Sequence, residues 1–230
     1  MEIKFPYGQS TLSIAIEDRN IAGFVTPELP LAVDSLQEIR RALKNPIANP
    51  GLKEIVKEKH PRSIVILVTD ISRPIPYQEI LEGLLEELQA GGGDAQIKFI
   101  IATGAHRPNT ELETAEVFGK MAQQYTFLNH DCDSNLVAMG TLKDGTKLLI
   151  NKDVSEADMV IITSCIMPHN LAGFSGGPKL ILPGVAGRKT IEANHSMMTS
   201  QQVGPGNIRN NPISEQIVEA ASLVGVDFSL

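Results

Sequence analysis

The sequence predicts an α/β protein whose sheet is doubly wound and mostly parallel, with helices on its faces. Continuously apolar runs at residues 63–69 and 96–102 have the length and β-branched content of strands buried on both faces. Segments with helical periodicity separate such runs. Strands that alternate with helices are typical of parallel pairing, so this pattern predicts a Rossmann-like fold.

Residues 1–60 are expected to form a small β/α entry layer packed on the main domain. Its expected elements are strands at 5–7 and 12–16, a turn at 8–10, and helices at 34–44, capped by Asp34, and 51–59.

Residues 61–230 are expected to form a cofactor-binding α/β domain. Beyond the two apolar runs, its expected elements are helices at 77–90, 110–121, 192–195 and 212–224, strands at 125–128 and 159–164, and a hairpin at 137–149 that turns at Asp144 and Gly145. Residues 225–230 resemble the beginning of another strand. A C-terminal domain that this sequence lacks is therefore expected in the full-length protein.

Composition excludes several classes of function. The 230 residues carry a net charge of −7 without a long basic run, so no nucleic-acid partner is expected. Cys132 and Cys165 form no Cys-x-x-Cys motif, which excludes a thiolate zinc cluster and a disulfide framework and fits a reducing cytosol. No signal peptide or membrane-length apolar run is present, so a cytoplasmic protein without a membrane partner is expected.

Polar segments follow three of the predicted strands, at residues 69–76, 103–108 and 165–179. In an open α/β sheet, ligands bind in the crevice beyond the carboxyl ends of the strands. Five side chains are expected to converge there: Asp70, Arg73, His106, His169 and Lys179. Their convergence is the main argument from the residues alone for a catalytic site.

Each of these residues also has an ordinary structural interpretation. Asp70 could cap a turn, Arg73 could be a surface charge, and His106 could be a solvated turn residue. Of the histidines outside these segments, His60 is interpreted as structural and His130 is left undecided.

The glycine-rich segment 173–179 matches neither a P-loop nor a dinucleotide fingerprint. Its glycines would let the backbone approach a phosphate, and Pro178 suits a first helical turn. A helix N-terminus would offer free N–H groups to an anion. It would also lower the pKa of Lys179, making the amine nucleophilic. A tight turn with an exposed lysine is the alternative.

His195 lies on the next predicted helix and could face the same site. A single histidine without cysteine or acidic neighbours is a poor metal site. It becomes credible where a cofactor supplies the remaining ligands.

Six pieces of sequence together resemble the nickel-dependent lactate racemase family. They are Asp-Ile-Ser-Arg-Pro at 70–74, Gly-Ala-His-Arg-Pro at 104–108, Pro-His-Asn at 168–170, Gly-Phe-Ser-Gly-Gly-Pro-Lys at 173–179, Pro-Gly-Val-Ala-Gly at 183–187 and Asn-His-Ser at 194–196. Their order and spacing are far more specific than any one of them. Ser72 stands where threonine is common in the family.

The resemblance implies a nickel pincer nucleotide, pyridinium-3,5-bisthiocarboxylic acid mononucleotide, attached to Lys179. It implies that His195 ligates the nickel, a ligand that suits square-planar Ni(II), and that cofactor-maturation proteins are partners. It also implies acid/base roles for His106 and His169. The expected cofactor contacts are Asp70, Arg73, Ser175, Gly176 and Gly177, and Arg73 is also expected to bind the substrate carboxylate.

The implied activity is that of an isomerase, a racemase or epimerase of lactate or a related small 2-hydroxy acid. Hydride removal and return through a 2-keto acid avoids deprotonating a weakly acidic carbon. Two bases on opposite faces of the keto acid would serve this chemistry, and histidine has a suitable pKa. Two alternatives stay open: a non-catalytic nucleotide- or phosphate-binding carrier module, and a hydrolase whose metal is held by His106, His169 and His195 within about 4 Å of one point.

Overall fold

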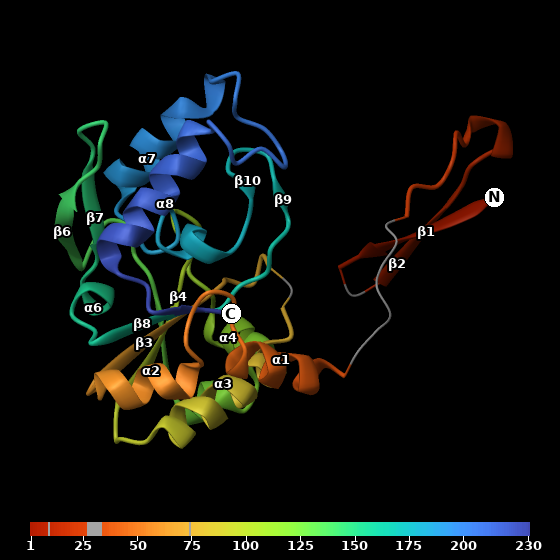
Figure 1. Ribbon diagram of the computed structural model, residues 1–230. Coiled ribbons are helices and arrows are strands. Elements are labelled where there is room, and N and C mark those ends of the chain that lie inside the picture. Colours follow the sequence, from red (N-terminus) through yellow and green to blue (C-terminus); the bar gives the residue numbers. More distant parts are fainter. Residues whose placement is uncertain (9, 27–33, 74) are drawn as a thin grey trace. The chain divides into compact units, whose positions relative to one another are not determined.

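The computed structural model describes residues 1–8, 10–26, 34–73 and 75–230 (Figure 1). The chain forms two compact units, Met1–Val33 and Asp34–Leu230. In the first unit, β1 (Glu2–Tyr7) pairs antiparallel with β2 (Ser10–Ala15), which confirms the two predicted strands. Gln9, in the predicted turn between them, lies outside the described residues, as does Pro74.

The two helices that follow, α1 (Ser35–Lys44) and α2 (Leu52–Lys59), belong to the second unit. Asp34 caps α1 as predicted, because its carboxylate accepts the Gln37 N–H at 2.8 Å. Both helices bury apolar side chains in the same cluster as α3 (Tyr77–Gly91). The units therefore divide at residue 33, whereas the sequence placed the boundary at residue 60.

The second unit is built on a five-stranded parallel sheet, which confirms the predicted fold class. In spatial order the strands are β11 (Phe228–Ser229), β8 (Met159–Ile162), β3 (Ser63–Val68), β4 (Gln96–Ile101) and β5 (Thr126–Asn129). The chain proceeds outward from β3 to β5 and then returns to the other side of β3 for β8 and β11. The strand order thus reverses between β3 and β8. Residues 225–230 do contain a strand, and it pairs with β8.

Side chains of β3 alternate between two hydrophobic cores, as a strand covered on both faces requires. Ile64, Ile66 and Val68 pack into the cluster that contains α1–α3. Val65 and Leu67 pack into the cluster on the opposite face. Figure 1 shows these helical layers on the two sides of the sheet. The first layer also contains α4 (Glu111–Phe118) and α5 (Met121–Gln124), and the second contains β6 (Leu136–Thr141), β7 (Lys147–Asn151), α6 (Lys152–Ser155), α7 (Arg188–Ser196) and α8 (Pro212–Val224).

Two predicted elements have different bounds in the structure. The helix expected at 110–121 is interrupted after Phe118, because Gly119 adopts φ 54° and a Cβ there would lie 2.7 Å from the Gln78 side chain. The helix expected at 192–195 is longer and begins at Arg188. The hairpin turn predicted at Asp144 and Gly145 is confirmed, with Gly145 at φ 89°.

None of the helices within the described ranges is both long and apolar enough to cross a bilayer. The cytoplasmic location stays a prediction.

Candidate functional site

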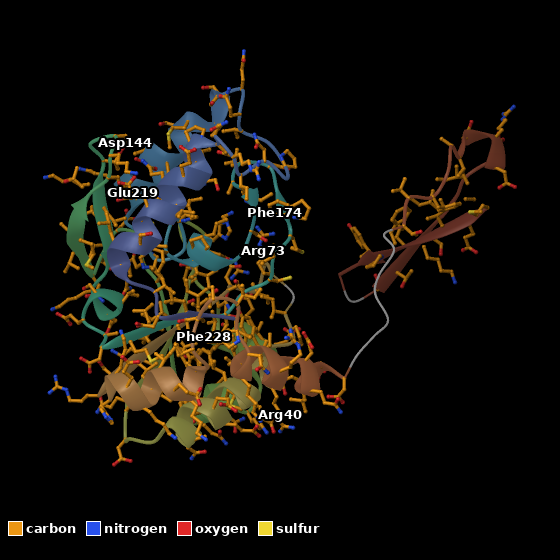
Figure 2. All side chains as sticks on the ribbon, in the orientation of Figure 1. Arg40, Arg73, Asp144, Phe174, Glu219 and Phe228 are labelled. Atoms are coloured by element: carbon orange, nitrogen blue, oxygen red, sulfur yellow. The ribbon has the colours of Figure 1, made fainter. Side chains whose placement is uncertain are left out.

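A cavity of about 220 Å³ lies at the carboxyl ends of β3 and β4, next to the point where the strand order reverses. Most of the predicted site residues line it: Asp70, Arg73, His106, Ser175, Gly176, Lys179 and His195. Figure 2 shows Arg73 at this edge of the sheet. His169 and Gly177 are outside the lining, although the charges of Lys179 and Arg73 act on His169.

Asp70 and His106 form a hydrogen-bonded pair across two neighbouring strands. His106 Nδ1 lies 2.7 Å from Asp70 Oδ2, and the Asp70 side chain is only 8% exposed whereas that of His106 is 64% exposed. The other carboxylate oxygen, Oδ1, accepts the Ser72 N–H at 3.0 Å. Asp70 therefore does cap its turn, and it also anchors a ring that reaches into the cavity.

The turn that carries His106 is held by the loop at Pro183 and Gly184. Gly104 adopts φ 58°, and its N–H donates to Gly184 O at 2.9 Å. The His106 N–H closes the turn by donating to Thr103 O at 3.0 Å. The two loops therefore fix each other, and both line the cavity.

The glycine-rich segment differs from its predicted conformation. It forms η2 (Gly177–Leu180), a four-residue 3-10 helix, so it has no α-helical N-terminus. The Gly177 N–H donates to Ser164 Oγ at 2.8 Å, the Lys179 N–H donates to Gly176 O at 3.2 Å, and Pro178 has no N–H. These N–H groups are therefore engaged within the protein, and the predicted anion cradle is not formed by them.

The Ser175 hydroxyl joins the two ends of the loop that begins after β8. It donates to Cys165 O at 3.0 Å and accepts the Met167 N–H at 3.0 Å. Gly176, at φ 80°, lies so close to this loop that a Cβ would be 2.8 Å from Cys165 O. Both residues therefore set the path of the backbone that leads to Lys179.

Lys179 is half-buried in the cavity wall, and its pKa is lowered to about 8. Burial is the largest cause and the positive charge of Arg73 is the second. The direction agrees with the sequence prediction, but the predicted cause, an α-helix dipole, is replaced by burial and a neighbouring cation. At pH 7 about a tenth of such amines are uncharged, far more than for an ordinary lysine.

His195 lies in the last turn of α7. Its Nδ1 is 3.0 Å from Ile191 O, which can only accept a hydrogen bond. The proton is therefore on Nδ1, and the Nε2 lone pair is free to bind a metal. Burial lowers its pKa, which also favours the neutral, metal-binding form.

His169 is in β9 (Pro168–His169), which pairs with β10 (Gly173–Phe174). Its Nδ1 accepts the N–H groups of Leu171 at 3.1 Å and Ala172 at 3.2 Å. Its pKa is lowered to about 4, first by burial and then by the charges of Lys179, Arg73 and His195. His169 is therefore a neutral ring at physiological pH.

The two remaining histidines lie outside the cavity lining. His130 is buried, its Nε2 is 2.9 Å from Ala186 O, and Asn151 Nδ2 is 3.3 Å from its Nδ1. It therefore supports the loop that contains Gly184. His60 is the left-handed C-cap of α2, with φ 47°, in agreement with its structural interpretation.

Sequence reasoning missed one contact and one residue of the site. It named Asp70 and His106 but did not pair them, although side chains at the ends of neighbouring parallel strands are brought together. It did not single out Ser164, which accepts the Gly177 N–H, because nothing in the local sequence marks that contact.

The family model for the lactate racemase N-terminal domain matches residues 7–206. The chain belongs to this family. It is 36% identical over 234 residues to the lactate racemase of Lactiplantibacillus plantarum, covering 98% of this chain and 55% of that protein. It is also 36% identical over 236 residues to the lactate racemase of Thermoanaerobacterium thermosaccharolyticum, again with 55% of that protein covered. The chain thus spans about half the length of these curated relatives.

Two solved structures have a similar fold. The lactate racemase apoprotein of T. thermosaccharolyticum superposes with a TM-score of 0.86 at 35% identity, covering 98% of this chain and 54% of that one. A Thermotoga maritima protein superposes with a TM-score of 0.65 over 83% of this chain and 48% of its own. At 21% identity this second likeness shows the fold alone.

Proposed function

We propose that this domain serves a racemase or epimerase of lactate or a related 2-hydroxy acid, in which Lys179 carries a nickel pincer nucleotide. The curated relatives that support the proposal are both named lactate racemase. The observation that carries it is that Lys179, His195 and the Asp70–His106 pair line one cavity.

The side chains in the cavity fit such a cofactor. The lowered pKa of Lys179, about 8, provides an uncharged amine for covalent attachment. The Ile191 carbonyl fixes the His195 tautomer that leaves Nε2 as a ligand atom, as hydrogen-bond acceptors behind metal-binding histidines do. When bound, the nickel cofactor would supply a reversible acceptor for the hydride removed from the substrate.

The remaining residues would bind and orient the acid. Arg73 lies close enough to lower the pKa of both Lys179 and His169, and its guanidinium can hold a carboxylate through two hydrogen bonds. The His106 ring is exposed toward the cavity and can take the hydroxyl proton as the hydride leaves. A cytoplasmic location and cofactor-maturation proteins as partners belong to the same proposal.

The proposal is tested by producing the chain together with cofactor-maturation proteins. We expect bound nickel and a mass increase that peptide mapping assigns to Lys179. Lys179→Ala should abolish the mass increase, whereas Lys189→Ala, at an exposed lysine of α7, should retain it. Racemisation is followed by chiral analysis of lactate and other 2-hydroxy acids. Matured protein that carries neither nickel nor a modified Lys179 would refute the proposal.

The two alternatives have less structural support. A phosphate-binding module needs free N–H groups, but those of Gly177 and Lys179 are bonded within the protein. A hydrolase metal site needs clustered histidines, but in the described parts of the chain the one close group of three metal-binding side chains is Asp131, Cys132 and Asp133.

A further inference from the structure

A tyrosine hydroxyl interrupts the hydrogen-bond ladder between β3 and β8 at the edge where the cavity lies. Just beyond the paired residues of the two strands, the Thr163 N–H donates to Leu67 O at 2.9 Å. In a parallel pair, the bond that follows would run from the Thr69 N–H back to Thr163 O. Tyr77 takes that place: its hydroxyl accepts the Thr69 N–H at 2.6 Å and donates to Thr163 O at 3.2 Å. One oxygen atom therefore stands between the two strands where their order in the sheet reverses.

The Tyr77 hydroxyl is held rigidly in this position. Thr69 Oγ1 lies 3.0 Å from it, and because the phenol proton is donated to Thr163 O, the Thr69 hydroxyl donates this third bond. Tyr77 is only 1% exposed, and burial raises its pKa, so the phenol keeps its proton at neutral pH. Its ring packs on that of Phe118, with the ring centroids 5.1 Å apart. Helix α3 thus presents a fixed hydroxyl to the strand ends.

On the β3 side, this hydroxyl closes the loop that carries Asp70 and Arg73. The loop follows Thr69, and Tyr77 is the first residue of α3. The hydroxyl therefore binds the residue that precedes the loop from the residue that follows it. Neither end of the loop can move relative to the other without loss of these buried hydrogen bonds.

On the β8 side, the same hydroxyl leads to Lys179. The next residue after Thr163 is Ser164, whose Oγ accepts the Gly177 N–H at 2.8 Å. Gly177 and Lys179 belong to the same short helix, η2. A displacement of Thr163 would therefore be passed to Lys179 through one hydrogen bond and a few residues of backbone.

We propose that Tyr77 is a positioning residue of the site, whose hydroxyl holds the ends of β3 and β8 apart and so sets the separation between Arg73 and Lys179. The inference rests on the proposed function, in which these two side chains hold the substrate carboxylate and the cofactor. A direct bond would bring the N and O atoms of the two strands to about 3 Å, whereas a bridging oxygen requires two hydrogen bonds in series. Thr69 lines the cavity and Tyr77 does not, so the tyrosine acts through its neighbours.

Scalar couplings across hydrogen bonds test the ladder in the wild-type chain, without cofactor or turnover. We expect a coupling between Thr163 N and the carbonyl carbon of Leu67. We expect none between Thr69 N and the carbonyl carbon of Thr163, because the tyrosine oxygen separates them. A coupling between Thr69 and Thr163 would show that the ladder continues directly and would overturn the inference.

Tyr77→Phe tests the positioning role, because it removes the hydroxyl and keeps the ring. The pKa of Lys179 is lowered by burial and by the charge of Arg73. A loosened loop should weaken both effects, so we expect the pH midpoint for acylation of Lys179 to move upward, toward that of an ordinary lysine. Phe118→Leu is the matched control: it loosens the packing of the same ring but retains the hydroxyl, and the midpoint should stay at the wild-type value.

Two results would remove Tyr77 from this role. An unchanged Lys179 midpoint in Tyr77→Phe would show that the hydroxyl does not position the site, and equal shifts in Tyr77→Phe and Phe118→Leu would make Tyr77 an ordinary core residue. Neither measurement uses nickel or a 2-hydroxy acid. A failure to load nickel therefore contradicts the proposed function, whereas an unchanged midpoint contradicts this inference alone.

Discussion

The Asp70 carboxylate and the His106 imidazole meet at 2.7 Å although they are 36 residues apart in the chain. Asp70 follows β3 and His106 follows β4, and the parallel register of these strands brings their carboxyl ends together. Asp70 is buried and His106 is exposed toward the cavity. The pair therefore combines a fixed anchor with an accessible ring nitrogen.

A glutamine substitution should test the base role proposed for His106 in cofactor-loaded protein. The glutamine amide can donate a hydrogen bond in place of the ring but cannot take up a proton. If the proposed function holds, we expect His106→Gln to lower the racemisation rate by about 100-fold or more, the usual loss when a general base is removed. The measurement is initial rates of lactate racemisation, and a rate within a few-fold of the wild type would contradict the base role of His106.

The reactivity of Lys179 should reveal its lowered pKa. The neutral amine reacts with acylating reagents, so the rate at Lys179 should level off near pH 8, the value to which its pKa is lowered. The same labelling at the exposed Lys189 provides the comparison. Arg73→Gln removes a positive charge and should move the Lys179 midpoint upward. Site-resolved mass spectrometry after timed labelling gives both curves, and identical curves for the two lysines would show that Lys179 is unperturbed.

His130 should make stability depend on pH below neutrality. Burial lowers the pKa of His130 in the folded protein, so the unfolded chain binds its proton first. The stabilisation that neutral His130 contributes is complete above about pH 6.5 and is lost as the pH falls from there through the lower pKa of the folded state. His130→Ala should cost about 3 kcal/mol at pH 7, because it leaves Ala186 O without its donor and opens a void.

His130→Gln serves as the matched control, since it retains a donor near the Nε2 position. Its free energy of unfolding, measured by urea denaturation, should fall between those of the wild type and His130→Ala. A wild-type slope between pH 7 and 5 that persists unchanged in His130→Gln would assign the pH dependence to another group.

Adjacent glycines in the segment before Lys179 should differ in their tolerance of alanine. Both have a positive φ, but a Cβ on Gly176 would lie 2.8 Å from Cys165 O, whereas a Cβ on Gly177 meets nothing within 4 Å. Gly177→Ala should cost about 1 kcal/mol from backbone strain alone. Gly176→Ala should cost about 3 kcal/mol, because the backbone must also shift. Thermal denaturation compares the stabilities of the two variants. Similar losses of stability would mean that the backbone at Cys165 can shift at little cost in free energy.

Much of the fold could be predicted from the sequence, because short segments of the chain determine where its strands, helix ends and turns lie. Continuous apolar runs mark strands buried on both faces, and Asp34 and the Asp144–Gly145 turn mark boundaries through short-range hydrogen bonds and positive φ angles. The strand-end rule also places Asp70, His106 and Lys179 near one crevice.

The details of the site depend on contacts that form only in the folded chain and that short sequence motifs do not reveal. The conformation of η2 is set partly by Ser164, thirteen residues before Gly177. The pKa of Lys179 depends on burial and on Arg73, which comes from another strand end. The tautomer of His169 depends on the backbone N–H groups of Leu171 and Ala172, which both donate to its Nδ1. Residue types alone therefore predicted two similar histidines, and the folded chain makes them different.

The wall of the cavity includes residues from Thr69 to His195, so it draws on most of the second unit. During synthesis, Lys179 emerges from the ribosome before α7 is complete, and the cavity cannot exist until His195 has followed and taken its place in the cavity wall. Any group that is joined to Lys179 within this cavity must therefore be delivered to a chain that has already folded. Attachment in that setting would report on the integrity of the domain, since a misfolded chain lacks the cavity wall.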